Sequence, residues 1–418
     1  MIETAIQKEK FLLVGVDTDD DADRAMASLR ELAELIDTAG GECVDFILQR
    51  LPKRNTATYV GSGKVTEILE RMEETGADGI VCDDELTPAQ ITNLREAGIA
   101  VVLDRTAVIL DIFAKHALTS EGKLQVEMAQ LKYRSSRLQG LGTSMSRLGG
   151  GIGTRGPGES KLETDRRRIR ERISILDAEI RKMQKSREVA RKQRSESALP
   201  VVAVVGYTNA GKSTLLNRLT DSKILAADQL FATLDPTTRN CRLPGGTEIL
   251  MTDTVGFINK LPHHLVDAFR STLEEAKYAD ILVHMVDASN DDCENQMKVV
   301  YETLDALGVG GKPVLTVFNK KDQMEDGRIL KDLRADQTMF LSAKTGDGID
   351  AFLETLEDAV NATRMLIEEL VAYTDAGKIA WVRKFGTILT EEYREDGIYI
   401  RAWVERSLGE AFSQRNFH

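Results

Sequence analysis

The sequence predicts a multidomain α/β protein, and three features of its 418 residues carry this prediction. β-type apolar runs alternate with helical stretches near the N-terminus, two narrow apolar seams flank a glycine-rich stretch, and a second glycine-rich loop joins a β-type run to a helical pattern. We expect an N-terminal α/β unit, a basic antiparallel helical hairpin with a glycine-rich tip (140–158), an open and mostly parallel sheet with helices on both faces, and a small α+β C-terminal domain. The predicted bounds are 1–110, 111–195, 196–364 and 365–418.

The N-terminal unit is predicted from four β-type runs separated by helical stretches. These runs are Phe11 to Val16, Glu42 to Gln49, Gly79 to Cys82 and Ile99 to Leu103. Gly61-Ser62-Gly63-Lys64 resembles a phosphate-binding loop, but Thr58 replaces the first glycine of that motif and Val65 replaces its final Ser or Thr. We interpret this segment as the start of a helix, with a second nucleotide site as the alternative.

The hairpin is predicted from apolar residues that recur in alternating steps of four and three, the spacing of a helix–helix seam. The helices would span about Leu118 to Leu148 and Ser160 to Gln193. Between them, Gly140 to Gly158 holds 8 glycines in 19 positions. The tip could be a simple linker, but the arginines among its glycines favour a binding surface for phosphates. The candidate contacts to RNA phosphates are Arg147, Gly151, Arg155 and Gly156. The seam residues are Leu124, Met128, Leu131, Ser135 and Leu138 on the first helix, and Ile169, Ile173, Leu176, Ile180 and Met183 on the second.

Charge is distributed unevenly along the chain. The net charge is −12, yet Lys115 to Ser195 contains 20 Lys and Arg against 9 Asp and Glu. This local excess of +11 leaves −23 for the remainder. A basic element on an acidic chain indicates one surface that meets a polyanion, rather than general affinity for nucleic acid.

A phosphate-binding loop begins at Gly206, after the β-type run Leu199 to Val205 and before the helical pattern Thr214 to Leu219. Its pattern is G-x-x-x-x-G-K-S, in which glycines allow backbone N–H groups to surround an anion. Lys212 would reach the β- and γ-phosphates, and Ser213 would bind Mg²⁺. The predicted nucleotide contacts here are Gly206, Tyr207, Thr208, Asn209, Ala210, Gly211, Lys212, Ser213 and Thr214.

Three further motifs follow in the order of a guanine-nucleotide site, each after a β-type run. After Glu248 to Thr252, Asp253 would hold Mg²⁺ through water, and the N–H of Gly256 would meet the γ-phosphate. After Val314 to Phe318, the Asp322 carboxylate can accept from two N–H groups of guanine, a pair that adenine lacks. The third motif follows Met339 to Leu341. The predicted contacts are Asp253, Thr254, Val255, Gly256, Asn319, Lys320, Asp322, Ser342, Ala343 and Lys344. Together these motifs predict a P-loop GTPase domain, because ligands bind at the carboxyl edge of such sheets.

A switch segment between these motifs should supply one threonine to Mg²⁺ and the γ-phosphate. Three threonines are available, namely Thr233, Thr237 and Thr238. The predicted contacts in this segment are Phe231, Ala232, Thr233, Leu234 and Asp235.

The residue after Gly256 is Phe257, where Ras-like GTPases have a glutamine that orients the attacking water. Phenylalanine neither donates nor accepts, so we expect slow intrinsic hydrolysis that needs assistance. Asn209 resembles the asparagine that helps K⁺-activated GTPases hold a monovalent cation, which implies possible use of K⁺; otherwise Asn209 is an ordinary loop residue. With Mg²⁺ as cofactor, the residues expected to act in hydrolysis are Lys212, Asn209, Gly256 and one of these three threonines.

Composition favours a cytoplasmic protein. No apolar run approaches the roughly 18 residues of a membrane span, and residues 1–10 lack the pattern of a signal or transit peptide. The four cysteines have no metal-binding spacing and are expected to be reduced, and the five histidines form no ligand pattern.

Nearly the whole chain resembles the HflX family of ribosome-associated GTPases. The most specific matches are the glycine tip leading into Gly156-Pro157-Gly158-Glu159, the switch segment Leu230 to Arg239, and Asp253 to Ile258. Ser160-Lys161 stands where the family usually has Thr-Gln. The resemblance favours Thr233 as the threonine that binds Mg²⁺ and acts in hydrolysis.

The resemblance also implies GTP hydrolysis stimulated by the large ribosomal subunit, insertion of the hairpin toward the peptidyl-transferase region, and splitting of stalled ribosomes under stress. We expect a monomer that is partly ribosome-associated. Two other functions stay open, namely an RNA-remodelling NTPase with a second nucleotide site in the N-terminal region, and a GTP switch that does not act on ribosomes.

Overall fold

The computed structural model describes residues 8–146, 157–194, 199–220, 230–231, 237–260, 275–325 and 327–405. For residues 139–146, 157–162, 187–194, 376, 384 and 405 the description is limited to the backbone. The chain forms two compact units. The first contains Met1–Arg181, Asp228–Leu234 and Ile258–Arg270, and the second contains Lys182–Ala227, Asp235–Phe257 and Ser271–His418.

A four-stranded parallel sheet organises the N-terminal part of the first unit, in the order β2-β1-β3-β4. Its strands are β1 (Lys10–Asp17), β2 (Glu42–Arg50), β3 (Gly79–Cys82) and β4 (Val101–Asp104). Its helices are α1 (Ala22–Ala39), α2 (Ser62–Thr75), α3 (Pro88–Glu96) and α4 (Arg105–His116). All four predicted strands are confirmed, with ends shifted by two residues or fewer.

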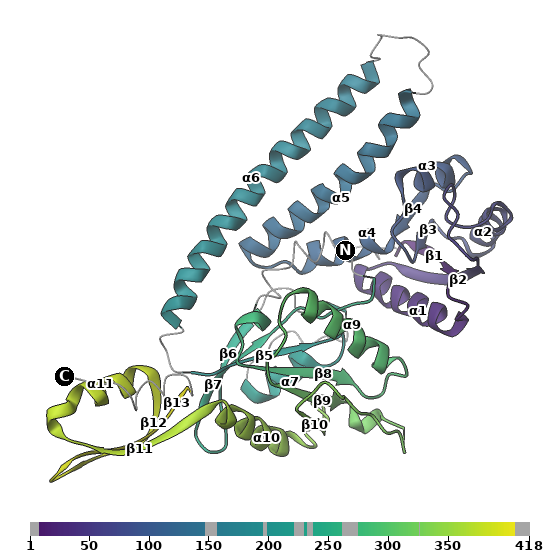
Figure 1. Ribbon diagram of the computed structural model, residues 1–418. Helices are drawn as coiled ribbons and strands as arrows, with labels where there is room; N and C mark the ends of the chain where they lie inside the picture. Colours follow the sequence, from purple (N-terminus) through teal and green to yellow (C-terminus); the bar gives the residue numbers. More distant parts are fainter. Residues whose placement is uncertain are drawn as a thin grey trace, which may run out of the picture. The chain divides into compact units, whose positions relative to one another are not determined.

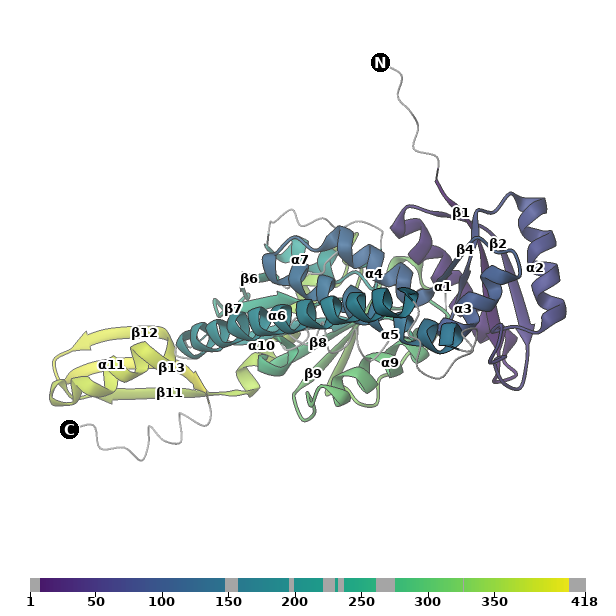
Figure 2. The same cartoon turned by 90° about the horizontal axis from the view of Figure 1, so that it is seen from above.

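Helices cover both faces of this sheet because the side chains of β1 alternate between them. Leu12 and Val14 pack against Ile68 of α2 and Leu94 of α3 on one face. On the other face, Gly15 lies against Leu29 of α1, and α1 and α2 are seen on opposite sides of the sheet in Figure 2. The helix predicted to start near Gly61 is α2, which Gly61 caps.

The predicted hairpin consists of α5 (Ser120–Ser146) and α6 (Pro157–Arg194), which run side by side (Figure 1). Both seams are used: Met128, Leu176 and Ile180 are buried, and Leu124, Leu131 and Ile173 pack against them. The helices also take in both ends of the predicted tip, since 140–146 and 157–158 are helical. Proline suits the first position of α6, because the N–H that it lacks has no partner inside a helix.

A second buried face on α5 was not predicted. Val126, Ala129 and Tyr133 are buried, and the Tyr133 hydroxyl donates to Asp104 at 2.6 Å. Arg137 also pairs with Asp104, at 2.6 Å. This face therefore fixes the root of the hairpin to the end of β4.

A six-stranded sheet organises the second unit, in the order β10-β9-β8-β5-β7-β6. Only β6 is antiparallel to its neighbour. The strands are β5 (Val201–Gly206), β6 (Thr237–Arg242), β7 (Glu248–Asp253), β8 (Ile281–Asp287), β9 (Val314–Asn319) and β10 (Gln337–Phe340). Its helices are α7 (Lys212–Thr220), α9 (Cys293–Ala306) and α10 (Ile349–Ala362), with a 3₁₀ turn η1 (Lys321–Gln323) after β9.

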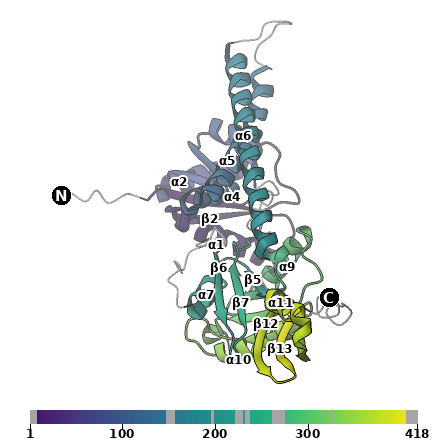
Figure 3. The ribbon, with the colours of Figure 1, turned by 90° about the vertical axis from the view of Figure 1, so that its left-hand side faces the viewer.

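The C-terminal region is a three-stranded antiparallel sheet in the order β11-β13-β12, with one helix against it (Figure 3). The helix buries Ile379 and Val382 against Ile400 and Val404 of the central strand. The central strand begins at Gly397. The elements are β11 (Arg364–Val371), η2 (Tyr373–Asp375), α11 (Ala376–Phe385), β12 (Gly386–Arg394) and β13 (Gly397–Glu405).

Candidate functional site

The predicted nucleotide motifs in the second unit lie on loops that leave one edge of the six-stranded sheet. They follow the carboxyl ends of β5, β7, β9 and β10. These strands all run in the same direction, because β5 pairs in parallel with β7 and β8, and β9 pairs in parallel with β8 and β10. Because parallel strands present their carboxyl ends at one edge, residues more than 100 positions apart in sequence come together there.

Two glycines of the loop after β5 allow very close packing. A Cβ on Gly206 would lie 2.3 Å from the Met285 carbonyl oxygen, and one on Gly211 would lie 2.2 Å from Asn319 Nδ2. Gly211 also has a φ of 91°, in the left-handed region that favours glycine. The glycines predicted from the motif are therefore required by the packing of the loop itself.

Lys212 lies inside this loop and is 7% exposed. Its Nζ donates to the carbonyl oxygens of Gly206 at 3.0 Å and Tyr207 at 2.7 Å. Burial lowers the pKa of Lys212 to about 8, although nearby Asp253 raises it. A buried ammonium that donates to neutral carbonyl oxygens would be stabilised by the charge of an anionic ligand.

Ser213 and Asp253 meet below the loop. Ser213 Oγ donates to Asp253 Oδ2 at 2.8 Å, and Asp253 is fully buried. Thr254, the next residue, donates from Oγ1 to the Val204 carbonyl oxygen at 2.8 Å. The carboxyl ends of β5 and β7 are thus joined by side chains.

Gly256 and Phe257 lie against the start of the same loop. A Cβ on Gly256 would lie 2.8 Å from Thr208 Cγ2 and 3.0 Å from Lys212 Nζ. The Phe257 N–H donates to the Gly206 carbonyl oxygen at 3.1 Å, and the Phe257 carbonyl accepts from the Thr208 N–H at 2.8 Å. The Phe257 ring is buried, so no polar group at this position faces the loop.

Asn319 links the loop after β5 to the loop after β10. Its Nδ2 donates to the Ala210 carbonyl oxygen at 2.8 Å, and its Oδ1 accepts from the Ala343 N–H at 2.9 Å. Asp322 follows on the 3₁₀ turn η1 and is exposed. Asn209 is likewise exposed and has a φ of 60°, which asparagine tolerates better than most residues.

Two supporting residues, Arg218 and Asp287, were not predicted. Arg218 donates to the carbonyl oxygens of Ala343 at 2.8 Å and Lys344 at 2.7 Å, and so supports the loop after β10. Asp287, the last residue of β8, pairs with Lys320 at 2.6 Å. The apolar run from Ile281 to Val286, ending in an aspartate, was the signal that could have revealed both β8 and Asp287.

Other predicted residues lie elsewhere. Phe231 belongs to the first unit, where it is buried. Ala232, Thr233, Leu234 and Asp235 lie outside the described residues, as do Arg147, Gly151, Arg155 and Gly156. The choice of Thr233 as the switch threonine thus stays a prediction. Thr237 and Thr238 are in β6, where Thr238 Oγ1 and Thr252 Oγ1 are 2.9 Å apart.

The described part of the chain shows no group of three or more His, Cys, Asp or Glu side chains arranged to hold a metal ion. Within the same residues, no helix is both long enough and apolar enough to cross a membrane. At the loop around Gly61, the Oε1 atom of Gln49 in β2 accepts from the Gly61 N–H at 2.8 Å, and Lys64 pairs with Glu67 at 2.7 Å.

Three family models match consecutive parts of the sequence. They are described as GTP-binding GTPase N-terminal (residues 26–114), GTP-binding GTPase Middle Region (116–194) and 50S ribosome-binding GTPase (201–320). Among solved structures, a GTP-binding protein from the archaeon Sulfolobus solfataricus in complex with GDP is similar over 85% of this chain and 99% of its own. Its sequence identity is 24% and the TM-score is 0.44.

Curated relatives match along almost the full length. A GTPase HflX from Lacrimispora saccharolytica is 56% identical over 98% of this chain and 96% of its own. A GTPase HflX from Caldanaerobacter subterraneus subsp. tengcongensis is 45% identical over 100% of this chain and 95% of its own. The phosphate loop, its buried lysine and the guanine-type motifs thus occur in a chain that belongs to the HflX family of GTPases and hydrolyses GTP.

Proposed function

We propose that this GTPase is a cytoplasmic, monomeric ribosome-binding factor that associates with the large ribosomal subunit in its GTP form and separates stalled ribosomes under stress. The observation that carries the proposal is the basic surface of α6. Arg167, Arg168 and Arg170 are exposed within one turn, and among the described residues Arg168 and Arg170 have no ion-pair partner. Such a surface fits RNA phosphates, and the family model over 201–320 is described as ribosome-binding.

In the proposed nucleotide site, Lys212 contacts the β- and γ-phosphates, and the N–H groups of residues 208–214 surround them. Gly256 meets the γ-phosphate. Asn319, Lys320 and Asp322 contact the base, with Ser342, Ala343 and Lys344 closing over it. The short distances between Gly211, Asn319 and Ala343 support this assignment, because they bring the phosphate and base motifs to one place.

Mg²⁺ fits the same site. Ser213 Oγ and Asp253 Oδ2 are 2.8 Å apart, and hydroxyl and carboxylate oxygens are the donors that Mg²⁺ prefers. Ser213 would bind the ion directly, Asp253 would act through water and Thr233 would supply a third oxygen. The ion would neutralise charge on the β- and γ-phosphates. Asn209 could assist with K⁺, which equal turnover in K⁺ and Na⁺ buffers would contradict.

GTP binding would order the segments around residues 226–239 and 253–262, and hydrolysis would release them. We propose that this ordering sets affinity for the ribosome. Splitting would follow from binding and steric displacement of the small subunit, and hydrolysis would permit release.

The ribosomal proposal predicts that large subunits stimulate GTP turnover through the hairpin. In the double variant Arg168→Glu, Arg170→Glu, we expect the stimulation at moderate salt to fall about tenfold, because reversed charges repel phosphates. Basal turnover should stay unchanged. The measurement is phosphate release in K⁺ and Mg²⁺, with and without purified large subunits.

The matched control is Arg30→Glu, Arg95→Glu, which reverses two exposed arginines on α1 and α3. This control should keep full stimulation. No stimulation of the unaltered protein, or full stimulation of the hairpin variant, would contradict the proposal.

The guanine assignment predicts a loss of base selectivity on changing Asp322. Asp322→Asn replaces one acceptor oxygen by a donor, and we expect the affinity for GDP to fall roughly 100-fold, since a charged hydrogen-bond pair to the base is lost. Titration with a fluorescent GDP analogue measures this. Asp347→Asn is the control, because it alters an exposed aspartate that pairs with Lys321 nearby. Unchanged GDP affinity in Asp322→Asn would remove this residue from the base site.

A further inference from the structure

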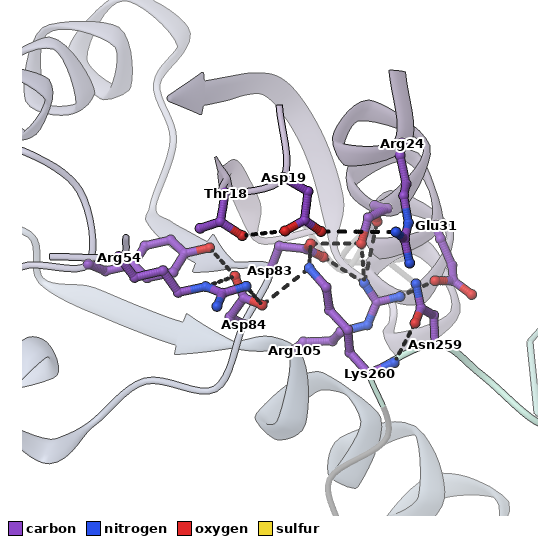
Figure 4. Close-up of polar contacts among 12 residues, drawn as sticks. Thr18, Asp19, Arg24, Glu31, Arg54, Asp83, Asp84, Arg105, Asn259 and Lys260 are labelled. Carbon is purple, nitrogen blue, oxygen red and sulfur yellow. Dashed lines mark hydrogen bonds and ion pairs between the residues drawn. The ribbon is translucent and has the colours of Figure 1, made fainter. Parts of the chain in front are cut away.

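Two adjacent carboxylates follow β3 in the first unit, and each is held by fixed partners (Figure 4). Asp83 is 3% exposed, accepts from Arg105 Nη1 at 2.6 Å and accepts from Ser28 Oγ at 2.7 Å. Asp84 forms a two-bond pair with Arg54, both at 2.8 Å, and accepts from the Tyr59 hydroxyl at 2.7 Å. These carboxylates are therefore rigidly placed.

Lys260 contacts both carboxylates. Its Nζ forms an ion pair with Asp83 and lies 3.2 Å from Asp84 Oδ1, and its side chain is only 32% exposed. Burial raises the pKa of Asp84, but Lys260, Tyr59 and Arg54 together hold it below the ordinary value. With Glu31, which pairs with Arg105, the cluster holds three carboxylates and three cations. Lys260 is thus needed to balance the charge of a partly buried cluster.

The backbone of Lys260 is held in an unfavourable conformation. Its φ is 54°, in the left-handed region that a lysine rarely adopts. The Asn259 side chain accepts from the Lys260 N–H at 2.9 Å. Such a conformation persists where the surroundings determine it, and the ion pair to Asp83 and Asp84 provides such surroundings.

Lys260 is close in sequence to the nucleotide loop. The chain leaves the second unit at Phe257 and enters the first at Ile258. Phe257 is bonded through its backbone to Gly206 and Thr208, and Gly256 precedes it. A segment of two residues, Ile258 and Asn259, therefore separates a backbone bridge on the phosphate loop from the ion pair of Lys260.

The other switch segment has a similar anchor. Phe231 directly precedes Ala232-Thr233, is 3% exposed and has a φ of 57°. Its ring packs edge-on against Phe113 of α4, with centroids 4.6 Å apart and an interplanar angle of 74°. Two segments are expected to contact the γ-phosphate. Phe231 precedes one of them and Lys260 follows the other, and both residues belong to the first unit and have a left-handed backbone conformation.

We propose that Lys260 is a positioning residue for GTP hydrolysis. By pairing with Asp83 and Asp84, it fixes the end of the short segment that begins at Gly256 and Phe257, and so keeps the Gly256 N–H where the γ-phosphate arrives. It would act through the backbone of this segment and not on the reacting atoms. Small displacements of a group that meets the reacting phosphate have large effects on rate. The inference rests on GTP hydrolysis and on the proposed contact of Gly256 with the γ-phosphate, and is independent of ribosome binding.

The first test is Lys260→Met in the full-length protein without ribosomes. We expect kcat for GTP to fall about tenfold, because the segment loses its fixed end. The Kd for GDP should stay within about twofold, since GDP lacks the γ-phosphate. Lys260→Arg should retain most of the activity because it preserves the cation. Lys8→Met, which removes an exposed lysine paired with Asp37 in the same unit, should leave kcat unchanged.

A double-mutant cycle with Asp84→Asn separates positioning from mere stability. Asp84 is chosen because removing buried Asp83 would take one of two carboxylates from the buried Arg105 and endanger folding. If Lys260 acts through this pair, the double variant should be no slower than Lys260→Met alone. Unchanged or increased kcat in Lys260→Met, a lower melting temperature with normal kcat, or multiplicative losses in the double variant would each overturn the proposal. A failure of ribosomal stimulation would leave these results untouched.

Discussion

Replacing Lys212 by methionine is expected to lower kcat/KM for GTP by roughly 10³-fold or more, because a buried cation at the proposed phosphate site is lost. In the structure Lys212 is 7% exposed, and among the described residues its ammonium donates to two carbonyl oxygens. Its charge is therefore poorly solvated until an anion binds. Methionine has a similar length and fills the space without the charge. Phosphate release at saturating and limiting GTP measures the loss.

The same variant should be at least as stable as the unaltered protein without nucleotide. Burial lowers the pKa of Lys212 from 10.5 to about 8 in the folded state, so the unfolded chain binds more protons between these values. The folded protein is destabilised by this group at neutral pH, and that effect declines as the pH rises from about 8 to 10.5.

A thermal melt at pH 7 without nucleotide should consequently give an equal or higher melting temperature for Lys212→Met. Lys298→Met is the control, since Lys298 is 69% exposed and pairs with Glu302 on α9. It should change neither turnover nor melting. Turnover of Lys212→Met within about threefold of normal would show that the loop does not bind phosphate as proposed.

Gly256→Ala is expected to lower kcat by roughly 100-fold, because the added methyl group has no room beside the phosphate loop. The Cβ would lie 2.8 Å from Thr208 Cγ2, 2.9 Å from Thr208 Cα and 3.0 Å from Lys212 Nζ. The Thr208 backbone cannot easily yield, so Gly256 or Lys212 must move. GDP binding should be retained, since Gly256 is expected to meet the γ-phosphate.

Single-turnover hydrolysis and GDP titration separate these two effects. Gly310→Ala is the matched control, because no atom lies within 4 Å of an added Cβ there. It should behave normally. If Gly256→Ala bound GDP and hydrolysed GTP at the normal rate, the packing of Gly256 on Lys212 would have no role in hydrolysis.

Regular elements and the order of the motifs could be predicted from sequence, because they depend on local patterns. The runs in Glu42 to Gln49 and Val314 to Phe318 became strands, and the seam through Met128 and Leu176 became the hairpin contact. The glycines of the phosphate loop were found from their spacing. Periodicity and turn chemistry are properties of short segments, so they survive without tertiary information.

Tertiary partners could not be predicted in the same way. Tyr133 and Arg137 were not expected to meet Asp104, because a single helix can bury a second face only once its neighbours are known. Lys260 and Asp83 are 177 positions apart, and an isolated lysine in a loop carries no sequence signal. Arg218 was missed for the same reason. Long-range pairing of polar side chains follows from topology, and the sequence pattern contains little of it.

The tight fit of Gly211 on Asn319 has a consequence for how the molecule distinguishes its two nucleotides. With 2.2 Å between a Cβ at residue 211 and Asn319 Nδ2, the phosphate loop cannot shift without strand β9. The groups that GTP and GDP share would then be recognised by a rigid, preformed binding site within one unit. The single phosphate in which they differ would be recognised by segments whose anchors, Phe231 and Lys260, belong to the other unit. Affinity for guanine nucleotides and discrimination between them are thus expected to vary independently under mutation.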